Sequence, residues 1–481
     1  MNIFKKAFKI SSIIIGVYFI PIFIYGNLYR DDNARVVYQY MGWDLDGRPV
    51  TNEIMYWINL GNGLTDIAPL SYIISIILCA LCCAIICSKI LNNGSVSIIA
   101  SSTFLFLSPL FLQNLSYRFD ILTMSLSILF GVMPFLITNC NEKWYSRKVS
   151  VFIFSALCVQ LILNTYQASL PVFYGSILLG FIANKNLRKY CLTMILGGTI
   201  SLIIYKIIIS PIYVGGGYAG ARAETIELSK DSISHFIDNI YEIKGILSIL
   251  HGEYVTYFLV PVFFVFIISM LLFLLDITKS INNTLLFSIS LAAFLASFLI
   301  FFVLKKPVYE LRMMIWVNFI IMMISIVAVC CMEKIKQLKS ISFVLIMPMA
   351  LLFFSIMSNY SNMQRLYSKY EESLVAAIYS DVSRLGINNG FYLNGYPKEP
   401  KLVSLIYKNH PVLRAISGGR LGISTGQFIL SDAPFLNAIA SYEKIPNKSE
   451  CNNILMNYNG VYTIIKYNDN NVVEFNDVKC N

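Results

Sequence analysis

Charged residues are scarce in this chain. They make up 13% of its 481 residues, whereas 57% are hydrophobic. An average soluble domain has roughly 25% charged residues. The shortage excludes an ordinary soluble protein and predicts a polytopic α-helical membrane protein.

Histidine is also rare. The three histidines, His235, His251 and His410, lie far apart and show no metal-ligand spacing. The glycine-rich stretch at residues 215–222 lacks the GKS/T of a phosphate-binding P-loop. We interpret this stretch as a mobile loop that covers substrate, and we expect neither a metal nor a cofactor.

The sequence also shows neither a signal-peptide cleavage site nor an internal repeat. No small-x-small cleavage site follows the apolar run at residues 10–25, which is therefore predicted to be a retained anchor. No internal repeat is visible, which counts against a transporter built from repeated halves. The net charge of +10 comes from basic residues spread over short loops, and this favours a cytoplasmic membrane rim over a nucleic-acid partner.

Long apolar runs recur along the first 358 residues. A bilayer crossing needs about 20 apolar residues. By that measure the sequence predicts eleven spans, near residues 9–26, 69–90, 95–113, 120–139, 149–163, 168–184, 190–209, 256–275, 284–303, 312–331 and 341–358. The fifth and sixth are short and joined by the polar tetrad NTYQ, so they are interpreted as two helices, with one broken helix as the alternative.

The basic residues predict the orientation. With a cytoplasmic N-terminus, the inner loops hold Lys89, Lys143, Arg147, Lys148, Lys185, Arg188, Lys189, Lys279, Lys334, Lys336 and Lys339. This is the positive-inside pattern. It places four segments on the outer side: residues 27–68, 114–120, 210–255 and 359–481.

The C-terminal region differs in character from the rest. Residues 359–481 lose the apolar runs, and the short stretches GFYLNG, GQFILS and GVYTIIKYN are typical of strands between turns. We therefore predict a transmembrane domain at residues 1–358 and a small mixed α/β domain at 359–481 on the outer face. Cys451 and Cys480 lie in this polar region, away from the other nine cysteines, and are predicted to form a disulfide.

Acidic residues gather in the first outer loop, residues 27–68. Asp31 and Asp32 come within a few residues of the bilayer edge, where a carboxylate is costly unless it is hydrated or partnered. Both are candidate general bases, with Asp66 in reserve. Asp44 and Asp46 are equally well explained as solvated loop residues. If a helix begins here, Asp31 shares a face with Arg35 at i, i+4, and Asp32 does not.

Two further charged clusters lie at outer ends of spans. The first is YRFD at residues 117–120, for which an arginine snorkelling beside an interfacial tyrosine is the alternative explanation. The second joins Lys305 and Lys306 to YELR at residues 309–312. Basic residues on the outer side are an exception to the positive-inside pattern, so they indicate binding of a lipid-linked phosphate. The alternative is simply a basic loop end.

An ordered set of short motifs resembles the Gtr family of bacterial serotype-converting glucosyltransferases. The motifs are RDDxxR at 30–35, GW at 42–43, GRP at 47–49, DxxPL at 66–70, SYRFD at 116–120 and YQ at 166–167. The resemblance implies a membrane glycosyltransferase of the C-type (GT-C) fold in the bacterial inner membrane, with an acidic catalytic residue in the first outer loop. It also implies undecaprenyl-phosphate glucose as the donor, the O-antigen repeat of lipopolysaccharide as the acceptor, and a small flippase and a donor synthase as partners.

This chemistry assigns roles to the charged residues. Displacing a phosphate from an anomeric carbon needs a base for the acceptor hydroxyl and cations for the leaving phosphate. A single base gives inversion, whereas retention needs a second carboxylate, so we predict an inverting enzyme with Asp31 or Asp32 as its base. The predicted phosphate ligands are Arg35, Arg118, Lys305, Lys306 and Arg312. The predicted pocket residues are Arg48, Tyr117, Asp120, Tyr166 and Gln167. Trp43 is interpreted either as a platform for an acceptor sugar or as an interfacial residue.

Two other functions fit a polytopic protein. A flippase or transporter for a lipid-linked glycan would carry its ionisable residues near mid-span, but here they fall at outer ends. An O-antigen polymerase or ligase would have its chemistry in a late loop. The glycosyltransferase hypothesis instead requires Asp31, Asp32, Arg118 and the Lys305 region to converge on one outward cavity.

Overall fold

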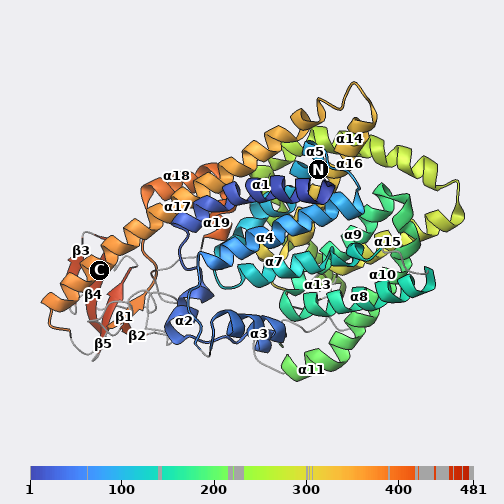
Figure 1. Cartoon of the computed structure of the whole chain (residues 1–481). Coiled ribbons are helices and arrows are strands. Elements are labelled where there is room, and N and C mark those ends of the chain that lie inside the picture. Colours follow the sequence, from blue (N-terminus) through green and yellow to red (C-terminus); the bar gives the residue numbers. More distant parts are fainter. Residues whose placement is uncertain are drawn as a thin grey trace.

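The structure is a computed structural model with a helical bundle and a small sheet at one end (Figure 1). It describes residues 2–61, 63–138, 144–214, 220, 232–299, 302, 304–305, 307–387, 391–417, 421, 438–439, 454–458, 460–467 and 470–475. Lys306, both cysteines of the predicted disulfide, nearly all of the glycine-rich stretch and the GQFILS segment lie outside these ranges.

Eight helical segments among the described residues are long and apolar enough to cross a membrane. Their helices are α1 (Ile3–Tyr25), α4 (Leu70–Ile85), α8 (Trp144–Thr165), α10 (Arg188–Ile204), α14 (Val255–Ile277), α15 (Ile281–Leu299), α16 (Ile315–Lys334) and α17 (Ser342–Arg384). The chain is therefore a multi-pass membrane protein. Short π-helices, η2 (Ile86–Ile90) and η7 (Tyr205–Ile209), extend α4 and α10.

Three of the eleven predicted spans are shorter or bent. Helix α5 (Val96–Leu107) and the segment Pro109–Ser116 form a pair bent by 42°, the latter made of η3 (Pro109–Phe111) and α6 (Leu112–Ser116). The other two are α7 (Ile121–Phe130), followed by η4 (Met133–Leu136), and α9 (Leu170–Ala183), preceded by η5 (Gln167–Ser169). The break between α8 and η5 falls at Tyr166, inside the NTYQ tetrad, in agreement with two helices. Eleven crossings remain a prediction.

Helices that hydropathy did not mark lie on or beyond the bundle. The first outer loop contains α2 (Asp31–Tyr38), η1 (Asp44–Asp46) and α3 (Pro49–Ile58), and the loop after α10 contains α11 (Ser210–Tyr213) and α13 (Ser232–Gly252). Short helices η6 (Lys185–Leu187) and η9 (Leu311–Met313) precede α10 and α16. In Figure 1, α2 and α3 lie below the bundle, at the side where α11 also lies.

Helix α17 is much longer than the predicted span at 341–358. Its 43 residues correspond to about 65 Å at 1.5 Å per residue, roughly twice the hydrocarbon thickness of a bilayer. The predicted span is the apolar first part of this helix, which continues past residue 358 as a polar helix. The end of the membrane crossing near residue 358 stays a prediction. Figure 1 shows α17 running from the bundle to the C-terminal sheet.

The C-terminal region contains a five-stranded mixed sheet in the order β2-β1-β5-β4-β3. Its strands are β1 (Phe391–Asn394), β2 (Ala438–Ile439), β3 (Ile454–Tyr458), β4 (Tyr462–Tyr467) and β5 (Asn470–Glu474). The pairs β3–β4 and β4–β5 are antiparallel, whereas β1 runs parallel to both neighbours. Leu374, Ile378 and Val382 of α17 pack against this sheet, and α18 (Lys401–Asn409) and α19 (Pro411–Ile416) lie between β1 and β2 in the chain. The predicted C-terminal sheet is confirmed.

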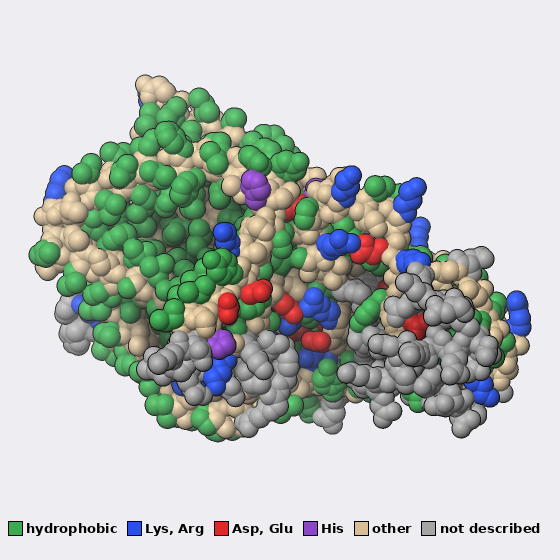
Figure 2. Space-filling model, turned by 180° about the vertical axis from the view of Figure 1, so that it is seen from behind, with side chains coloured by type: hydrophobic (Ala, Val, Ile, Leu, Met, Phe, Trp, Pro, Cys, Tyr) green, Lys and Arg blue, Asp and Glu red, His purple; other side chains and the backbone are tan. Residues whose placement is uncertain are grey.

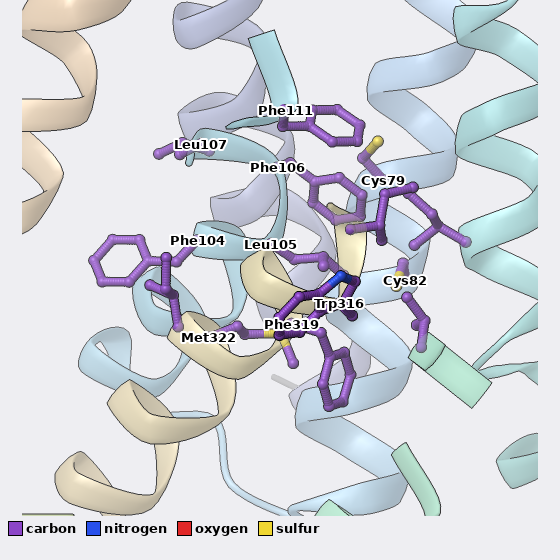
Figure 3. Close-up of a cluster of buried hydrophobic side chains, with 14 of the residues drawn as sticks. Cys79, Cys82, Phe104, Leu105, Phe106, Leu107, Phe111, Trp316, Phe319 and Met322 are labelled. Atoms are coloured by element: carbon purple, nitrogen blue, oxygen red, sulfur yellow. The ribbon is translucent and has the colours of Figure 1, made fainter. Parts of the chain in front are cut away.

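Hydrophobic packing holds the bundle together. Phe106 and Phe111 lie toward Cys79 of α4, and Trp316 and Phe319 of α16 fill the space beside them (Figure 3). Figure 2 shows hydrophobic side chains over a broad, hollowed area of the bundle, with most charged side chains of that face gathered beside it. An apolar outer surface of this kind is expected where helices contact lipid.

Helix α9 approaches its neighbours so closely that it needs a glycine. A Cβ at Gly175 would lie 2.4 Å from Phe319 Cε1 and 2.9 Å from Phe294 Cε2. Both rings are buried and contact each other, with centroids 5.9 Å apart. Neither ring can move without disturbing the packing of α15 and α16.

Gly175→Ala is therefore expected to destabilise the protein by about 1–3 kcal/mol through overpacking. The matched control is Gly16→Ala in α1, where no atom lies within 4 Å of the added Cβ; it is expected to be neutral or to stabilise by up to about 1 kcal/mol through helix propensity. The measurement is the midpoint of thermal unfolding in detergent, followed by dye labelling of the buried cysteines. Equal midpoints for the two variants would contradict the close contact.

Candidate active site

The first outer loop starts with a strained residue. Arg30 caps α2 with a φ of 44°, a left-handed conformation that costs a non-glycine residue about 1–3 kcal/mol. Its Nη1 donates to Glu310 Oε1 at 2.7 Å. This ion pair holds the turn after α1 and fixes Asp31 and Asp32 as the first two residues of α2.

Asp32 is buried and connects the loop after α1 to the turn before α7. Its side chain is fully buried, and Oδ2 accepts hydrogen bonds from the backbone N–H groups of Tyr29 at 3.3 Å and Arg118 at 2.9 Å. Oδ1 has no partner within the described residues. Burial, reinforced by the negative charge of Asp120, raises the pKa of the Asp32 carboxyl well above its ordinary value. Asp32 thus ties the first outer loop to the turn before α7, where substrate cannot reach it.

Asp31 differs from its neighbour because it is exposed. The carboxylate is exposed to solvent on one side, and the surrounding protein reduces its hydration on the others. This desolvation raises the pKa of Asp31 above its ordinary value, although the nearby Arg312 guanidinium lowers it. An accessible carboxylate with a raised pKa is suited to accept a proton near neutral pH.

Glu310 joins two arginines next to Asp31. Besides accepting from Arg30, it accepts from Arg312 Nε at 2.9 Å and from Gln113 Nε2 at 3.2 Å. The Arg312 guanidinium also lies over the ring of Tyr117, with Cζ 4.5 Å from the centroid. Its Nη groups make no hydrogen bond within the described residues, and 21% of the side chain is exposed. Arg312 is therefore held in place with donors left for an anion.

Arg118 and Asp66 form a second pair beside this group. Arg118 Nη2 lies 3.1 Å from Asp66 Oδ2, and both side chains are partly exposed. The other oxygen of Asp66 accepts from the backbone N–H of Ala68 at 2.9 Å. Since the carboxylate of Asp66 is paired with a cation, it is less suited than Asp31 to act as a base.

Arg35 and Trp43 stabilise the loop from inside. Arg35 is 6% exposed, donates to the carbonyl of Met41, and lies 3.8 Å from the centroid of the Trp43 ring. Trp43 is fully buried, and its Nε1 donates to Asp120 Oδ1 at 2.7 Å. A fully buried ring offers no face to an acceptor sugar, so the interpretation of Trp43 as a sugar platform was wrong. The interfacial interpretation stays a prediction. The Arg35 guanidinium is engaged in the loop, which speaks against its predicted contact with phosphate.

The predicted pocket residues belong to the same network. Arg48 pairs with Asp46 at 2.6 Å and lies 3.5 Å from Asp120 Oδ1. The Tyr166 hydroxyl donates to the carbonyl of Arg312 at 3.0 Å, and Gln167 Nε2 donates to the carbonyl of Gly47 at 3.3 Å. Gly47 adopts a φ of 75°, and a Cβ there would lie 2.5 Å from the Tyr205 hydroxyl, so the GRP motif needs its glycine.

Three residues of the site escaped the sequence analysis, namely Tyr29, Gln113 and Asn114. Arg30 was part of the RDDxxR motif but had no predicted role. Gln113 Oε1 accepts from the backbone N–H of Arg312 at 2.8 Å, and Asn114 Nδ2 donates to its carbonyl at 3.2 Å. An adjacent Gln and Asn at the end of an apolar run was the available signal, because polar residues inside a membrane protein need partners.

The structure thus brings together most of the predicted residues. Asp31, Asp32, Arg118 and Arg312 converge where α1 ends and α16 begins. Lys305 is half-buried, and its segment reaches the site through Glu310 and Arg312. Among the described residues, no group of three or more His, Cys, Asp or Glu side chains is placed to hold a metal ion. A carboxylate that accepts a proton, next to arginines that bind a phosphate, is suited to transfer of a group from a phosphate-linked donor.

Comparison with known proteins leads to the same chemistry. A family model described as glucosyl transferase GtrII matches residues 20–323. An uncharacterised 55.3 kDa protein in the gtrB 5′ region of Salmonella phage P22 is 26% identical over 427 residues, which cover 84% of this chain and 85% of that protein. No solved structure matches. The family match spans more than half of the chain and contains Asp31, Arg118 and Arg312, so the chain belongs to the GtrII glucosyltransferase family and is a membrane glycosyltransferase.

Proposed function

We propose that this enzyme transfers glucose from undecaprenyl-phosphate glucose to a sugar of the O-antigen repeat, on the periplasmic side of the bacterial inner membrane. The observation that carries the proposal is the accessible Asp31, whose pKa is raised, beside the partly exposed Arg312. Modification of the O-antigen in this way would change the serotype of the cell.

Asp31 is the base of the proposed reaction. Its carboxylate takes the proton of the acceptor hydroxyl, the hydroxyl oxygen forms a bond to the anomeric carbon, and the bond from that carbon to the phosphate oxygen breaks. The phosphate leaves with the electron pair on its lipid. Attack opposite to the leaving group inverts the configuration, and the acceptor must approach from the side where Asp31 is exposed.

Arginines stabilise the leaving phosphate in this mechanism. Arg312 is the main candidate, because its Nη groups make no hydrogen bond within the described residues while Glu310 and Tyr117 hold it. Arg118 is the second, although Asp66 engages one of its nitrogens. Fixed donors aimed at developing charge are among the largest contributors to catalysis. Asp32 acts indirectly, by holding Arg118 and the start of α2 in position.

The architecture suits a lipid-linked donor. The site lies between the ends of α1 and α6 and the start of α16, which are membrane-crossing or bent apolar segments. A phosphate at headgroup depth could reach it while the prenyl chain stays in the bilayer. We further propose the GT-C fold, a cytoplasmic N-terminus supported by the positive-inside pattern, and cooperation with a flippase and a donor synthase that deliver the donor.

Asp31→Asn is expected to lower kcat at least 100-fold with little change in KM, because a positioned base contributes about 10²–10⁴-fold. Purified protein would be assayed for transfer from undecaprenyl-phosphate glucose to O-antigen polysaccharide. The matched control is Asp44→Asn in the same loop, where the side chain makes no hydrogen bond or ion pair within the described residues; it should leave kcat unchanged. Loss of activity in Asp32→Asn with normal turnover in Asp31→Asn would transfer the base to Asp32.

Arg312→Gln is expected to shift the acidic limb of the pH profile of kcat/KM to higher pH. Asp31 must be deprotonated to act, so activity rises as pH passes its pKa, which desolvation holds above the ordinary value and which Arg312 lowers. Removal of the guanidinium therefore raises this pKa further. Arg365→Gln on α17 removes the same charge from a residue that stacks on Tyr25, and it should leave the limb in place. A limb that stays fixed in Arg312→Gln would contradict the proposed role of Asp31.

A further inference from the structure

A cavity lined in part by basic side chains lies at the opposite end of the bundle from Asp31. It has a volume of about 960 Å³. Arg312 precedes α16, whereas Lys334, in the wall of this cavity, ends it. The 20 residues of α16 correspond to about 30 Å, so the cavity is separated from the transfer site by the thickness of the membrane. In the proposed topology this is the cytoplasmic end.

Basic side chains from four separate segments line the cavity. They are Lys6, Lys185, Arg188, Lys334 and Lys339. Only two carboxylates, Asp276 and Glu333, share the lining, and Asp276 already lies 3.5 Å from Lys185 Nζ while Glu333 accepts from Asn93 at 3.1 Å. The lining therefore carries an excess of positive charge, which favours an anion.

Arg188 is held in a position from which it can bind an anion. Its Nε donates to the carbonyl of Phe181 at 3.2 Å, and its guanidinium lies over the rings of Phe181 and Phe273, with Cζ 4.9 and 5.7 Å from their centroids. The Nη groups make no hydrogen bond within the described residues. A planar guanidinium held by two rings presents its remaining donors without further loss of side-chain freedom. The hydroxyl of Ser269, also in the lining, is buried and lacks a partner in the described part of the chain.

The other walls of the cavity are apolar, and some of their side chains are exposed on the outside of the bundle. Leu272 and Phe273 of α14 and Val327 of α16 belong to the lining. Only 6% of the apolar stretch of α14 is buried inside the protein. The side chain of Leu272 is 59% exposed. A soluble anion would gain nothing from these walls, whereas a molecule with a charged head and a hydrocarbon tail would contact both kinds of surface.

We propose that this cavity binds the phosphate headgroup of an anionic glycerophospholipid of the inner leaflet, separately from the transfer site. The phosphate lies among Arg188, Lys334 and Lys339, and the acyl chains lie along α14. The lipid neutralises the excess charge and joins α14 to the α16 end of the bundle. The cytoplasmic placement rests on the proposed topology; the binding itself does not depend on the proposed reaction.

The test measures how many lipids the full-length protein retains. Protein in detergent is incubated with phosphatidylglycerol, phosphatidylcholine or inorganic phosphate, and native mass spectrometry counts bound molecules while thermal unfolding reports stabilisation. The cavity variant is Lys334→Gln/Lys339→Gln. The matched control is Lys189→Gln/Lys336→Gln, which removes the same charge from lysines that face the same end of the bundle but are not in the lining.

We expect wild-type and control proteins to retain phosphatidylglycerol, and the cavity variant to bind it at least tenfold more weakly while it unfolds at the wild-type midpoint without lipid. Phosphatidylcholine should not be retained. Equal loss in both variants would mean only general surface attraction and would overturn the proposal. Stabilisation by inorganic phosphate equal to that by the lipid would also overturn it in favour of a soluble anion. Transfer activity of the cavity variant in detergent should stay normal, which separates this test from that of Asp31.

Discussion

The candidate active site depends on the buried carboxylate of Asp32. Taking a carboxylate out of water is costly unless hydrogen bonds replace those of the solvent. Asp32 finds them in the backbone of Tyr29 and of Arg118, the latter 86 positions away in the chain. These two segments must therefore meet for the loop to fold. Because successive helical residues point in different directions, burial of Asp32 leaves Asp31 at the surface.

Glu310 completes the site by adding a third segment of the chain. Its two oxygens bind Arg30 from the first loop and Arg312 from the start of α16, and Gln113 from α6 joins them. Each segment adjoins an apolar helix of the bundle, so helix packing sets the distances between the charged groups. A site supported by rigid elements keeps its geometry better than one supported by a loop alone.

Hydropathy predicted most helices because contact with lipid demands apolar runs, and it failed where a helix leaves the lipid. The polar second half of α17 and all of α13 went unmarked for that reason. Charges near membrane edges identified Asp31, Arg118 and Arg312. The sequence could not separate Asp31 from Asp32, or Arg35 from Arg312, because their roles depend on burial and, for Asp32 and Arg312, on partners more than 80 positions away.

Pairing of cations with carboxylates has a consequence for the proposed reaction. A donor phosphodiester carries one negative charge, whereas the departing lipid phosphate gains a second as its bond to the sugar breaks. Arg312, which Glu310 holds in place, attracts the second negative charge that develops in the transition state in addition to the single charge of the bound donor. Binding that strengthens along the reaction raises kcat, whereas uniform binding does not. The fixed guanidinium of Arg312 thus stabilises the transition state more than the bound donor and contributes to turnover.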